Sequence, residues 1–426
     1  MHETRKPNET AFVIHPVLPG GRHEDSYLND RLEEACGLAR AINLEVVHAD
    51  IMTVNKVSPA QLLSKGLLER LTQQVKEQNP TVVILDTALS PGQQRNLETA
   101  LQTKVIDRTG LILEIFGERA QTREGRIQVD LALLEYQRSR LVRAWTHLER
   151  QRGGAGFMGG PGETQIEIDR RLIGQRISKL KKELEDVRRT RNLAKETRQN
   201  VPYPVVALVG YTNAGKSTLF NKLTGANVYA EDLPFATLDP TMRQLKLPSG
   251  QEVIFSDTVG FISDLPTHLV AAFRATLEQV TQADIILHVR DISRTDHATQ
   301  AEDVNKILTD LGVEVETDPR ILEVWNKIDL LEEDDRGEAL RKTKFDPAVI
   351  AVSAVTGEGL EHLLNAINAN LTRDHIKKTV TVDAANGKAL AWLYSHGEVL
   401  EQKEKGAQII ITARLSKPMW DRYKNL

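Results

Sequence analysis

Residues 204–220 read "PVVALVGYTNAGKSTLF", and this stretch decides how the chain folds. Its first part has the apolar, β-branched composition of a buried strand, and residues 210–217 match the phosphate-binding pattern G-x-x-x-x-G-K-[ST]. A helical pattern begins directly afterwards. A glycine-rich loop between a strand and a helix turns its N–H groups toward an anion. The stretch therefore predicts a nucleotide phosphate site within an α/β sheet.

The residue types of this loop indicate how a nucleotide is held. Gly210 and Gly215 allow the backbone to wrap around the phosphates. We expect Lys216 to lie against the β- and γ-phosphates and Ser217 to offer its hydroxyl group to Mg²⁺. The other loop residues expected at the nucleotide are Tyr211, Thr212, Asn213, Ala214 and Thr218. A chance loop of this form is the alternative, and the strand–loop–helix context argues against it.

The base is predicted by "NKID" at residues 326–329, which ends another strand-like run. The carboxylate of Asp329 can accept from both N1–H and the exocyclic amine of guanine, whereas adenine presents an acceptor at N1. A buried mismatch of this kind discriminates strongly. Asn326 is expected at the purine edge or at the phosphate loop, and Lys327 over the base.

A third base element is "SAVTG", which follows the next strand-like run. There we expect the backbone of Ser353 and Ala354 to meet the guanine oxygen. Together with the preceding motif, it predicts a guanine nucleotide.

Two motifs between these elements predict the groups that meet Mg²⁺ and the γ-phosphate. Asp257 of "DTVG" is placed to hold Mg²⁺ through water, and the N–H of Gly260 can meet the γ-phosphate. Thr237 of "PFATLDPT" is the natural second Mg²⁺ ligand, with Asp239 as the alternative. The nucleotide-site residues of these two motifs are Phe235, Ala236, Thr237, Asp257, Thr258, Val259 and Gly260. The predicted catalytic residues are Lys216, Thr237 and Gly260.

The five motifs come in the order phosphate loop, switch threonine, D-x-x-G, N-K-x-D and S-A, which predicts a GTPase that uses GTP, GDP and Mg²⁺. Ras-like enzymes have a glutamine directly after D-x-x-G that orients the attacking water. This chain has Phe261 there, and a phenyl ring cannot hydrogen-bond water. We therefore expect slow unaided turnover and stimulation by a partner, with a merely inefficient enzyme as the alternative.

Particular stretches resemble a known family. The sequences "NAGKSTLFNKLTG", "PFATLDPT" and "DTVGFI" are similar to the Obg–HflX group of translation-associated GTPases, and "GGPGETQIEIDRR" at residues 159–171 resembles the signature of the HflX family. The resemblance covers roughly residues 10–370 and is weakest in the tail. Family members often carry a basic residue before this Gly-Pro-Gly, whereas this chain has Gly159.

The chain begins with four short β-like runs, "AFVIHP", "LEVVHA", "TVVILD" and "KVIDR". They alternate with helical patterns over roughly residues 28–42, 60–78 and 93–102, which predicts a small doubly wound α/β domain over residues 1–115. No glycine-rich phosphate motif follows these runs, so a binding or scaffolding module is expected. We interpret the acidic residues at two strand ends, Asp86 and Asp107, as surface or capping residues rather than catalytic ones.

Residues 116–200 carry two heptad-like apolar series and predict an antiparallel helical hairpin arm. The first series is Leu131, Leu134, Leu141, Trp145 and Leu148, with Arg138 in the missing slot, and the second is Ile173, Ile177, Leu180, Leu184 and Val187. Basic residues outnumber acidic ones by five between residues 165 and 198. A solvated coiled-coil face and a nucleic-acid contact are both open for this charge.

The glycine-rich loop "GGAGFMGGPGE" at residues 153–163 would form the tip of the arm. Its apolar Phe157 could stack on an unpaired base, and flanking arginines could meet phosphates. The expected RNA contacts are Arg150, Arg152, Phe157, Met158, Arg170 and Arg171. A flexible hinge is the alternative.

Two further domains complete the expected organisation. The GTPase domain spans residues 201–372, with strands expected over 204–210, 243–247, 252–257, 284–291, 320–326 and 348–353. A small α+β domain spans residues 373–426, with two β-like runs and a helical stretch around "KALAWLYS". The predicted fold class is therefore multi-domain α/β.

Composition limits which partners, covalent links and cellular locations the chain can have. The formal net charge of −4 does not indicate a nucleic-acid partner, so such a partner needs a local basic patch. Cys36 is the only cysteine, which excludes an intrachain disulfide and a multi-cysteine metal site. No stretch approaches the ~18 consecutive apolar residues of a membrane span, and the start lacks a signal peptide, so we expect a cytoplasmic protein.

The resemblance implies association with the ribosome, chiefly its large subunit, and a role in ribosome integrity under stress. The leading expectation is a monomeric, GTP-dependent factor that separates or rescues stalled ribosomes. One alternative is a regulatory GTP switch that binds a protein effector without RNA. Another is an RNA-modification or ribosome-assembly GTPase. This alternative is disfavoured because neither a cysteine motif nor a cofactor-binding motif accompanies the GTPase domain.

Overall fold

The structure is a computed structural model that describes residues 9–21, 24–151, 161–198, 203–226, 233–238, 241–263, 279–415 and 417–424. The chain is a multi-domain α/β protein, as predicted. It divides into two compact units. The first comprises Met1–Asn200, Glu231–Asp239 and Val259–Ala275, and the second Val201–Ala230, Pro240–Thr258 and Thr276–Leu426.

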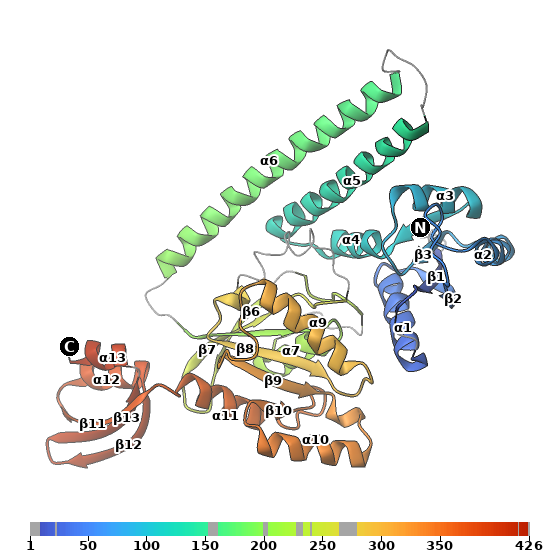
Figure 1. The fold of residues 1–426 in the computed structure, drawn as a ribbon. Helices are drawn as coiled ribbons and strands as arrows, with labels where there is room; N and C mark the ends of the chain where they lie inside the picture. The colour runs from blue at the N-terminus through green and yellow to red at the C-terminus, as the bar shows by residue number, and fades with distance from the viewer. Residues whose placement is uncertain are drawn as a thin grey trace, which may run out of the picture. The chain divides into compact units, whose positions relative to one another are not determined.

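The first unit opens with a parallel sheet of order β2-β1-β3-β4 among the described residues (Figure 1). Its strands are β1 (Thr10–Val17), β2 (Glu45–Thr53), β3 (Val82–Leu85) and β4 (Lys104–Asp107). Its helices are α1 (Asp25–Ala41), α2 (Lys65–Gln78), α3 (Pro91–Leu101) and α4 (Arg108–Arg119). Helices α2 and α3 contact each other, as do α1 and α4, which is the doubly wound arrangement expected. Helix α4 was not foreseen.

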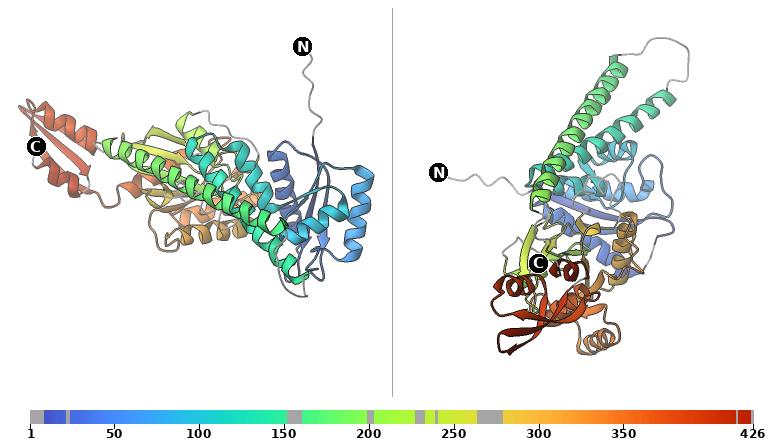
Figure 2. Two further views of the ribbon diagram at one scale, coloured as in Figure 1. Left: turned by 90° about the horizontal axis from the view of Figure 1, so that it is seen from above. Right: turned by 90° about the vertical axis from the view of Figure 1, so that its left-hand side faces the viewer.

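Two long helices follow in the same unit, α5 (Arg123–Gln151) and α6 (Pro161–Arg198), and they run side by side in Figures 1 and 2. Their seam is a buried apolar cluster of Ile127, Leu131, Ile177, Leu180 and Leu184, with Leu134, Ile173 and Val187 packed against it. Lys181 of α6 pairs with Glu135 of α5 at 3.0 Å. The heptad pattern is therefore confirmed as the contact seam for Leu131 and Leu134 of the first series and for all five residues of the second, whereas Leu141 is described but is not part of this cluster. The side chains of Trp145 and Leu148 lie outside the described set.

The second unit contains a sheet of order β10-β9-β8-β5-β7-β6, in which only β6 of the described strands runs antiparallel to its neighbour. The strands are β5 (Val205–Gly210), β6 (Thr241–Lys246), β7 (Glu252–Asp257), β8 (Ile285–Asp291), β9 (Ile321–Asn326) and β10 (Val349–Ala351). The helices are α7 (Lys216–Thr224), α9 (His297–Asp310), η1 (Ile328–Leu330), α10 (Glu333–Phe345) and α11 (Leu360–Leu371). All six expected strands are present, and β5 occupies an interior position, so the loop that follows it emerges from the middle of the sheet.

The tail forms an antiparallel sheet of order β11-β13-β12 with two helices packed on it. Its elements are β11 (Ile376–Asp383), α12 (Gly387–His396), β12 (Glu398–Lys405), β13 (Gln408–Leu415) and α13 (Lys417–Tyr423). Strand β12 and helix α13 were not foreseen. The sequence of β12, "EVLEQKEK", has no apolar alternation because this strand is exposed at the sheet edge, where charged residues are common.

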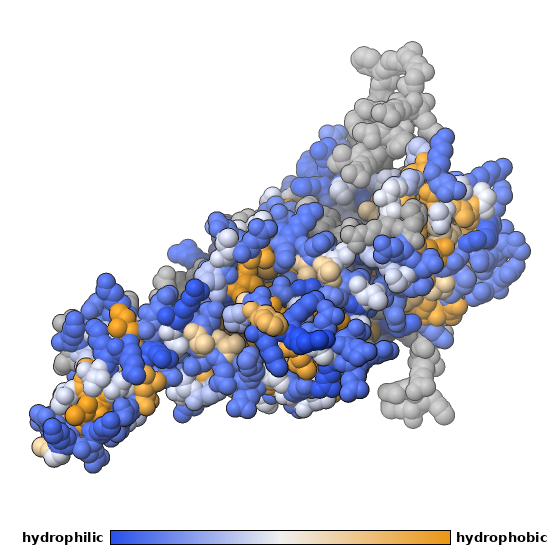
Figure 3. Space-filling view, turned by 60° about the horizontal axis from the view of Figure 1, so that its bottom comes forward, coloured by the Kyte–Doolittle hydropathy of each residue, from blue (hydrophilic) through white to orange (hydrophobic). Residues whose placement is uncertain are grey.

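The surface drawn in Figure 3 is largely hydrophilic, with small separate hydrophobic patches. Among the described residues, no helix is both long and apolar enough to cross a membrane.

Candidate nucleotide-binding site

The two glycines of the phosphate loop are required by close contacts. Gly210 ends β5 with φ +153°, and a Cβ atom there would lie 2.2 Å from the carbonyl oxygen of Val289 on β8. Gly215 has φ +88°, and its Cβ would lie 2.2 Å from Nδ2 of Asn326. No side chain fits at either position, so the loop geometry depends on glycine.

Helix α7 begins at Lys216, directly after the glycine loop. Its N-cap residue is Gly215, so no N-cap side chain covers the N–H groups of the first turn. Those groups and the positive end of the helix dipole favour an anion at this point.

Lys216 is buried within the loop that precedes it. Its Nζ donates to the carbonyl oxygens of Tyr211 at 2.7 Å and Gly210 at 3.1 Å. Burial lowers the pKa of Lys216 to about 8, and the nearby charge of Asp257 opposes that shift. The ammonium group is thus a desolvated cation beside the phosphate loop, and an incoming phosphate would raise its pKa and stabilise its charged form.

The hydroxyl of Ser217 donates to Oδ2 of Asp257 at 2.7 Å, which joins α7 to the end of β7. The neighbouring Thr258 hydroxyl donates to the carbonyl oxygen of Leu208 at 2.5 Å and fixes the main chain after β7. A hydroxyl and a carboxylate are oxygen donors of the kind Mg²⁺ takes. A pair of protein oxygen donors fits Mg²⁺, which proteins usually hold through one or two side chains together with substrate phosphates and water.

The base-recognition motifs are joined by Asn326. Its Nδ2 donates to the carbonyl oxygen of Ala214 at 2.9 Å, and its Oδ1 accepts from the N–H of Ala354 at 3.0 Å. The sequence left two positions open for this side chain, and the structure places it against the phosphate loop. Ser353 lies beside Ala354, and its Oγ accepts from the N–H of Thr356 at 3.0 Å.

One carboxylate oxygen of Asp329, Oδ1, is buried and has no hydrogen-bond partner among the described residues. A buried acceptor without a donor is costly, and the paired donors of guanine would satisfy it. Lys327 lies in the left-handed region with φ +65°, and its Nζ pairs with Oδ2 of Asp291 at 2.7 Å. Sequence reasoning missed Asp291, although its position at the end of β8 was a usable signal.

The predicted switch residues Phe235, Ala236, Thr237, Val259 and Gly260 belong to the first unit. Thr237 and Gly260 are buried. The ring of Phe235 packs edge-on against Phe116 with centroids 4.6 Å apart. Phe261 is also buried. Asp239 lies outside the described residues.

The predicted RNA contacts are only partly visible. Arg170 and Arg171 are exposed on α6, and Arg150 lies in α5 with its side chain outside the described set. Arg152, Phe157 and Met158 lie outside the described residues.

Asp86 and Asp107, at two strand ends, were both expected to be surface or capping residues, and the structure confirms this for only one of them. Asp107 is the N-cap of α4 and accepts from the N–H of Gly110 at 2.8 Å, so its capping role is confirmed. The interpretation of Asp86 as a surface or capping residue is wrong, because its buried carboxylate is paired with Arg108 and His15.

Comparison with known proteins covers nearly the whole chain. Family models described as "GTP-binding GTPase N-terminal", "GTP-binding GTPase Middle Region", "50S ribosome-binding GTPase" and "HflX C-terminal domain" match residues 29–117, 119–198, 205–327 and 338–420. A GTPase HflX of Magnetococcus marinus is 52% identical over 404 residues, which is 95% of this chain and 92% of that protein.

A GTPase HflX of Escherichia coli K12 is 40% identical over 423 residues, with 99% of this chain and 97% of that protein covered. A solved structure of a Sulfolobus solfataricus GTP-binding protein with GDP is 23% identical, with a TM-score of 0.45, over 86% of this chain and 99% of that chain. The phosphate loop, the guanine motifs and the full-length sequence matches agree: this chain belongs to the HflX family and is a GTP-binding, GTP-hydrolysing protein.

Proposed function

We propose that this GTPase is a cytoplasmic, monomeric factor that binds the large ribosomal subunit and separates or rescues stalled ribosomes under stress. The main support for this proposal is that the same chain contains a GTPase domain and an arm, formed by α5 and α6, with an excess of basic residues on α6. Helix α6 has an excess of basic residues, with Arg170 and Arg171 exposed on it. Such a surface suits the phosphate backbone of RNA. The description "50S ribosome-binding GTPase" of the model matching residues 205–327 supports the same partner.

Within the GTPase site, we assign the residues the roles that their chemistry supports. The α7 N-terminus and Lys216 hold the phosphates, and Asp329 faces guanine. The Ala354 N–H, expected at the guanine oxygen, donates to Oδ1 of Asn326 instead, so it would have to exchange that bond to reach the base. Ser217, Thr237 and, through water, Asp257 would hold Mg²⁺, which neutralises charge on the β- and γ-phosphates when bound. The Gly260 N–H meets the γ-phosphate.

The basal rate is proposed to be slow and to rise on the large subunit. Phe261 is buried and apolar, so it cannot orient the attacking water. Phosphoryl transfer depends mainly on placement and charge stabilisation, which a bound partner can complete. Phosphate release should therefore increase when purified large subunits are added.

Sedimentation through sucrose with large subunits, in GDP or a non-hydrolysable GTP analogue, tests the proposal. We expect co-sedimentation to be stronger with the analogue and to weaken as salt rises. The double variant Arg170→Glu with Arg171→Glu should lose binding but keep the basal GTPase rate. Arg341→Glu with Lys344→Glu, the same charge change at exposed positions of α10, is the matched control. Equal binding by both double variants would exclude this part of α6 as the RNA contact.

The arm tip needs a separate test. Replacing residues 153–162 by a Gly/Ser segment of equal length should leave basal hydrolysis near wild type and reduce ribosome-directed activity. Retention of full ribosome-directed activity would make the tip a spacer. Absence of any ribosome binding by the wild-type protein would favour a protein effector.

A further inference from the structure

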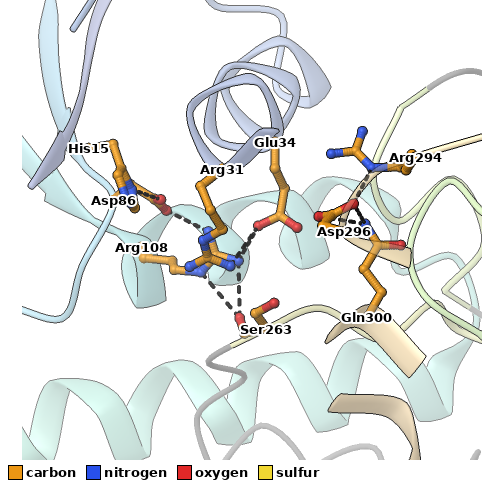
Figure 4. Close-up of polar contacts among 9 residues, drawn as sticks. All are labelled: His15, Arg31, Glu34, Asp86, Arg108, Ser263, Arg294, Asp296 and Gln300. Carbon is orange, nitrogen blue, oxygen red and sulfur yellow. Dashed lines mark hydrogen bonds and ion pairs between the residues drawn. The ribbon is translucent and has the colours of Figure 1, made fainter. Parts of the chain in front are cut away.

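A buried cluster of ionisable side chains lies at the carboxyl edge of the N-terminal sheet (Figure 4). His15 lies on β1, Asp86 follows β3, and Arg108 begins α4 directly after β4. Glu34 and Arg31 reach the cluster from α1. The carboxyl edge is where open α/β sheets bind their ligands. The nucleotide site of the second unit uses none of these residues.

Arg108 is the centre of this cluster, and its side chain is only 3% exposed. Its Nη1 donates to Oδ1 of Asp86 at 2.5 Å, and its Nη2 donates to Oε1 of Glu34 at 2.6 Å. The other oxygen of Asp86 contacts Nδ1 of His15 at 2.7 Å. The two carboxylates thus fix the plane of the guanidinium group.

The electrostatic balance shows that Asp86 is charged. Burial works to raise the pKa of Asp86, but Arg108 and the hydrogen bond with His15 outweigh it and hold the pKa well below its ordinary value. Removing the arginine charge would leave the buried Asp86 carboxylate with His15 but without its guanidinium partner, which is strongly destabilising. A charge-conserving substitution is therefore the informative one.

The remaining donors of Arg108 point at main chain far away in sequence. Nη2 and Nε lie 3.0 and 3.3 Å from the carbonyl oxygen of Ser263. Ser263 is three residues after Gly260, and Gly260, Phe261 and Ile262 are all buried. The buried residues 260–262 are thus followed by a carbonyl group, that of Ser263, which accepts two hydrogen bonds from the fixed guanidinium group of Arg108.

The segment before Thr237 is also held by the N-terminal helices. Phe235 has φ +57°, an unfavourable value for a residue with a Cβ, and its ring is packed against Phe116 of α4. Pro234 lies beside α1, where a Cβ on Gly37 would be in ordinary van der Waals contact with its ring, at 3.5 Å. Both switch segments are therefore in contact with the N-terminal α/β layer.

We propose that Arg108 is a positioning residue for GTP hydrolysis, which holds residues 260–263 through the Ser263 carbonyl so that the Gly260 N–H is presented to the γ-phosphate. The proposal rests on the assigned role of Gly260. Arg108 is not among the residues assigned to the nucleotide or to Mg²⁺. It acts by removing conformational freedom from the segment before GTP binds, which lowers the cost of ordering it.

This arrangement has a distinctive consequence. GDP has no γ-phosphate and gains nothing from an ordered Gly260, whereas GTP does. A residue that acts only through this segment must change the affinity for the two nucleotides unequally. A merely structural residue would change both affinities together or neither.

Arg108→Lys is the main variant, because a lysine keeps the positive charge beside Asp86 and Glu34 but cannot form the planar fork. We expect the affinity for a non-hydrolysable GTP analogue to fall about fivefold or more, with the GDP affinity within twofold of wild type. The kcat should fall as well. Glu34→Gln, which removes one of the two groups that orient the guanidinium, should give a smaller change in the same direction and serves if the lysine variant does not fold.

Arg140→Lys is the matched control. Arg140 also pairs with a buried aspartate of the same layer, Asp107 at 2.6 Å, and it has no described contact with residues 259–263. It should leave the ratio of the two affinities unchanged. An unchanged ratio in folded Arg108→Lys, or an equal shift in Arg140→Lys, overturns the proposal.

Gly260→Ala separates this proposal from the function on which it rests. If this variant loses analogue affinity but Arg108→Lys does not, Arg108 has no positioning role and the role of Gly260 stands. If Gly260→Ala also leaves the ratio unchanged, the assigned role of Gly260 is wrong, and the Arg108 proposal fails with it.

Discussion

Ser217 donates a 2.7 Å hydrogen bond to Oδ2 of Asp257, and this contact joins the first turn of α7 to the end of β7. It brings together two oxygen donors that are 40 residues apart in sequence. The proposed Mg²⁺ site is built on this pair.

Ser217→Ala should reduce Mg²⁺-dependent GTP turnover by about 100-fold or more, because it removes a direct metal ligand, and even groups that only support a ligand cost 10–100-fold. Phosphate release measured across a Mg²⁺ titration checks this. Ser249→Ala removes a hydroxyl that bonds Asn368 in the same unit and is the control. Near wild-type turnover by the Ser217 variant would show that Ser217 is not a ligand of Mg²⁺.

Asp329→Asn should change base preference from guanine to xanthine nucleotides. The amide nitrogen can donate to the additional carbonyl of xanthine, whereas one of the two acceptor oxygens available to the paired donors of guanine is lost. Competition binding with GDP and xanthosine diphosphate measures the change, with the exposed Asp334→Asn in α10 as control. Unchanged preference for GDP would mean that another group recognises the base.

Nucleotide affinity should depend on pH through Lys216. Burial lowers its pKa to about 8, so the nucleotide-free protein loses the ammonium charge above that pH. We expect GDP to bind about tenfold more weakly at pH 9 than at pH 7. Lys216→Arg stays protonated and should lose this dependence, while any titration of the nucleotide itself remains. A flat profile in the wild-type protein would contradict the assignment.

The same group has the opposite effect on stability. An unfolded lysine has a pKa near 10.4, so between pH 8 and about 10 the unfolded chain binds more protons than the folded chain. The contribution of Lys216 to the free energy of unfolding of the nucleotide-free protein therefore rises with pH in that window. Denaturant unfolding of wild type and Lys216→Arg at several pH values would show the difference, and parallel curves would disprove it.

Tyr136→Phe should loosen the attachment of α5 to the N-terminal layer. The Tyr136 hydroxyl donates to Oδ1 of Asp107 at 2.7 Å, and burial, followed by the charge of Asp107, raises the pKa of Tyr136. Loss of this hydrogen bond to a buried carboxylate should lower the free energy of unfolding by about 1–3 kcal/mol. Tyr394→Phe, which removes a hydroxyl of an exposed α12 residue that donates to Oε1 of Gln402, is the control. Equal stability of both variants would show that the hydroxyl contributes nothing to this attachment.

Local sequence determined the elements whose signals are periodic or chemical. The strand–loop–helix around residues 204–220, the strands with apolar composition and the arm seam from Ile173 to Val187 with Leu131 and Leu134 all follow from side-chain periodicity. The phosphate loop needs glycine at position 210 because the main chain of Val289 lies where a Cβ atom would be. The motif itself predicts a glycine at that position. The exposed strand β12 was missed because an edge strand has no buried face to impose an apolar pattern.

Only the tertiary structure decided what the polar residues outside the motifs do. Asp86 and Arg108 are separated by 22 residues, and Arg108 and Ser263 by 155, so no local pattern relates them. The fold brings the ends of β3 and β4 and the segment after Gly260 together in the interior. A buried charge there is stable only when it is paired and hydrogen-bonded, so these residues contact one another. The sequence by itself therefore determined that the chain binds and hydrolyses GTP, because that chemistry lies in contiguous motifs. The fold alone decided that a buried arginine of the N-terminal layer contacts the segment after Gly260, because long-range burial sets the partners of a charge.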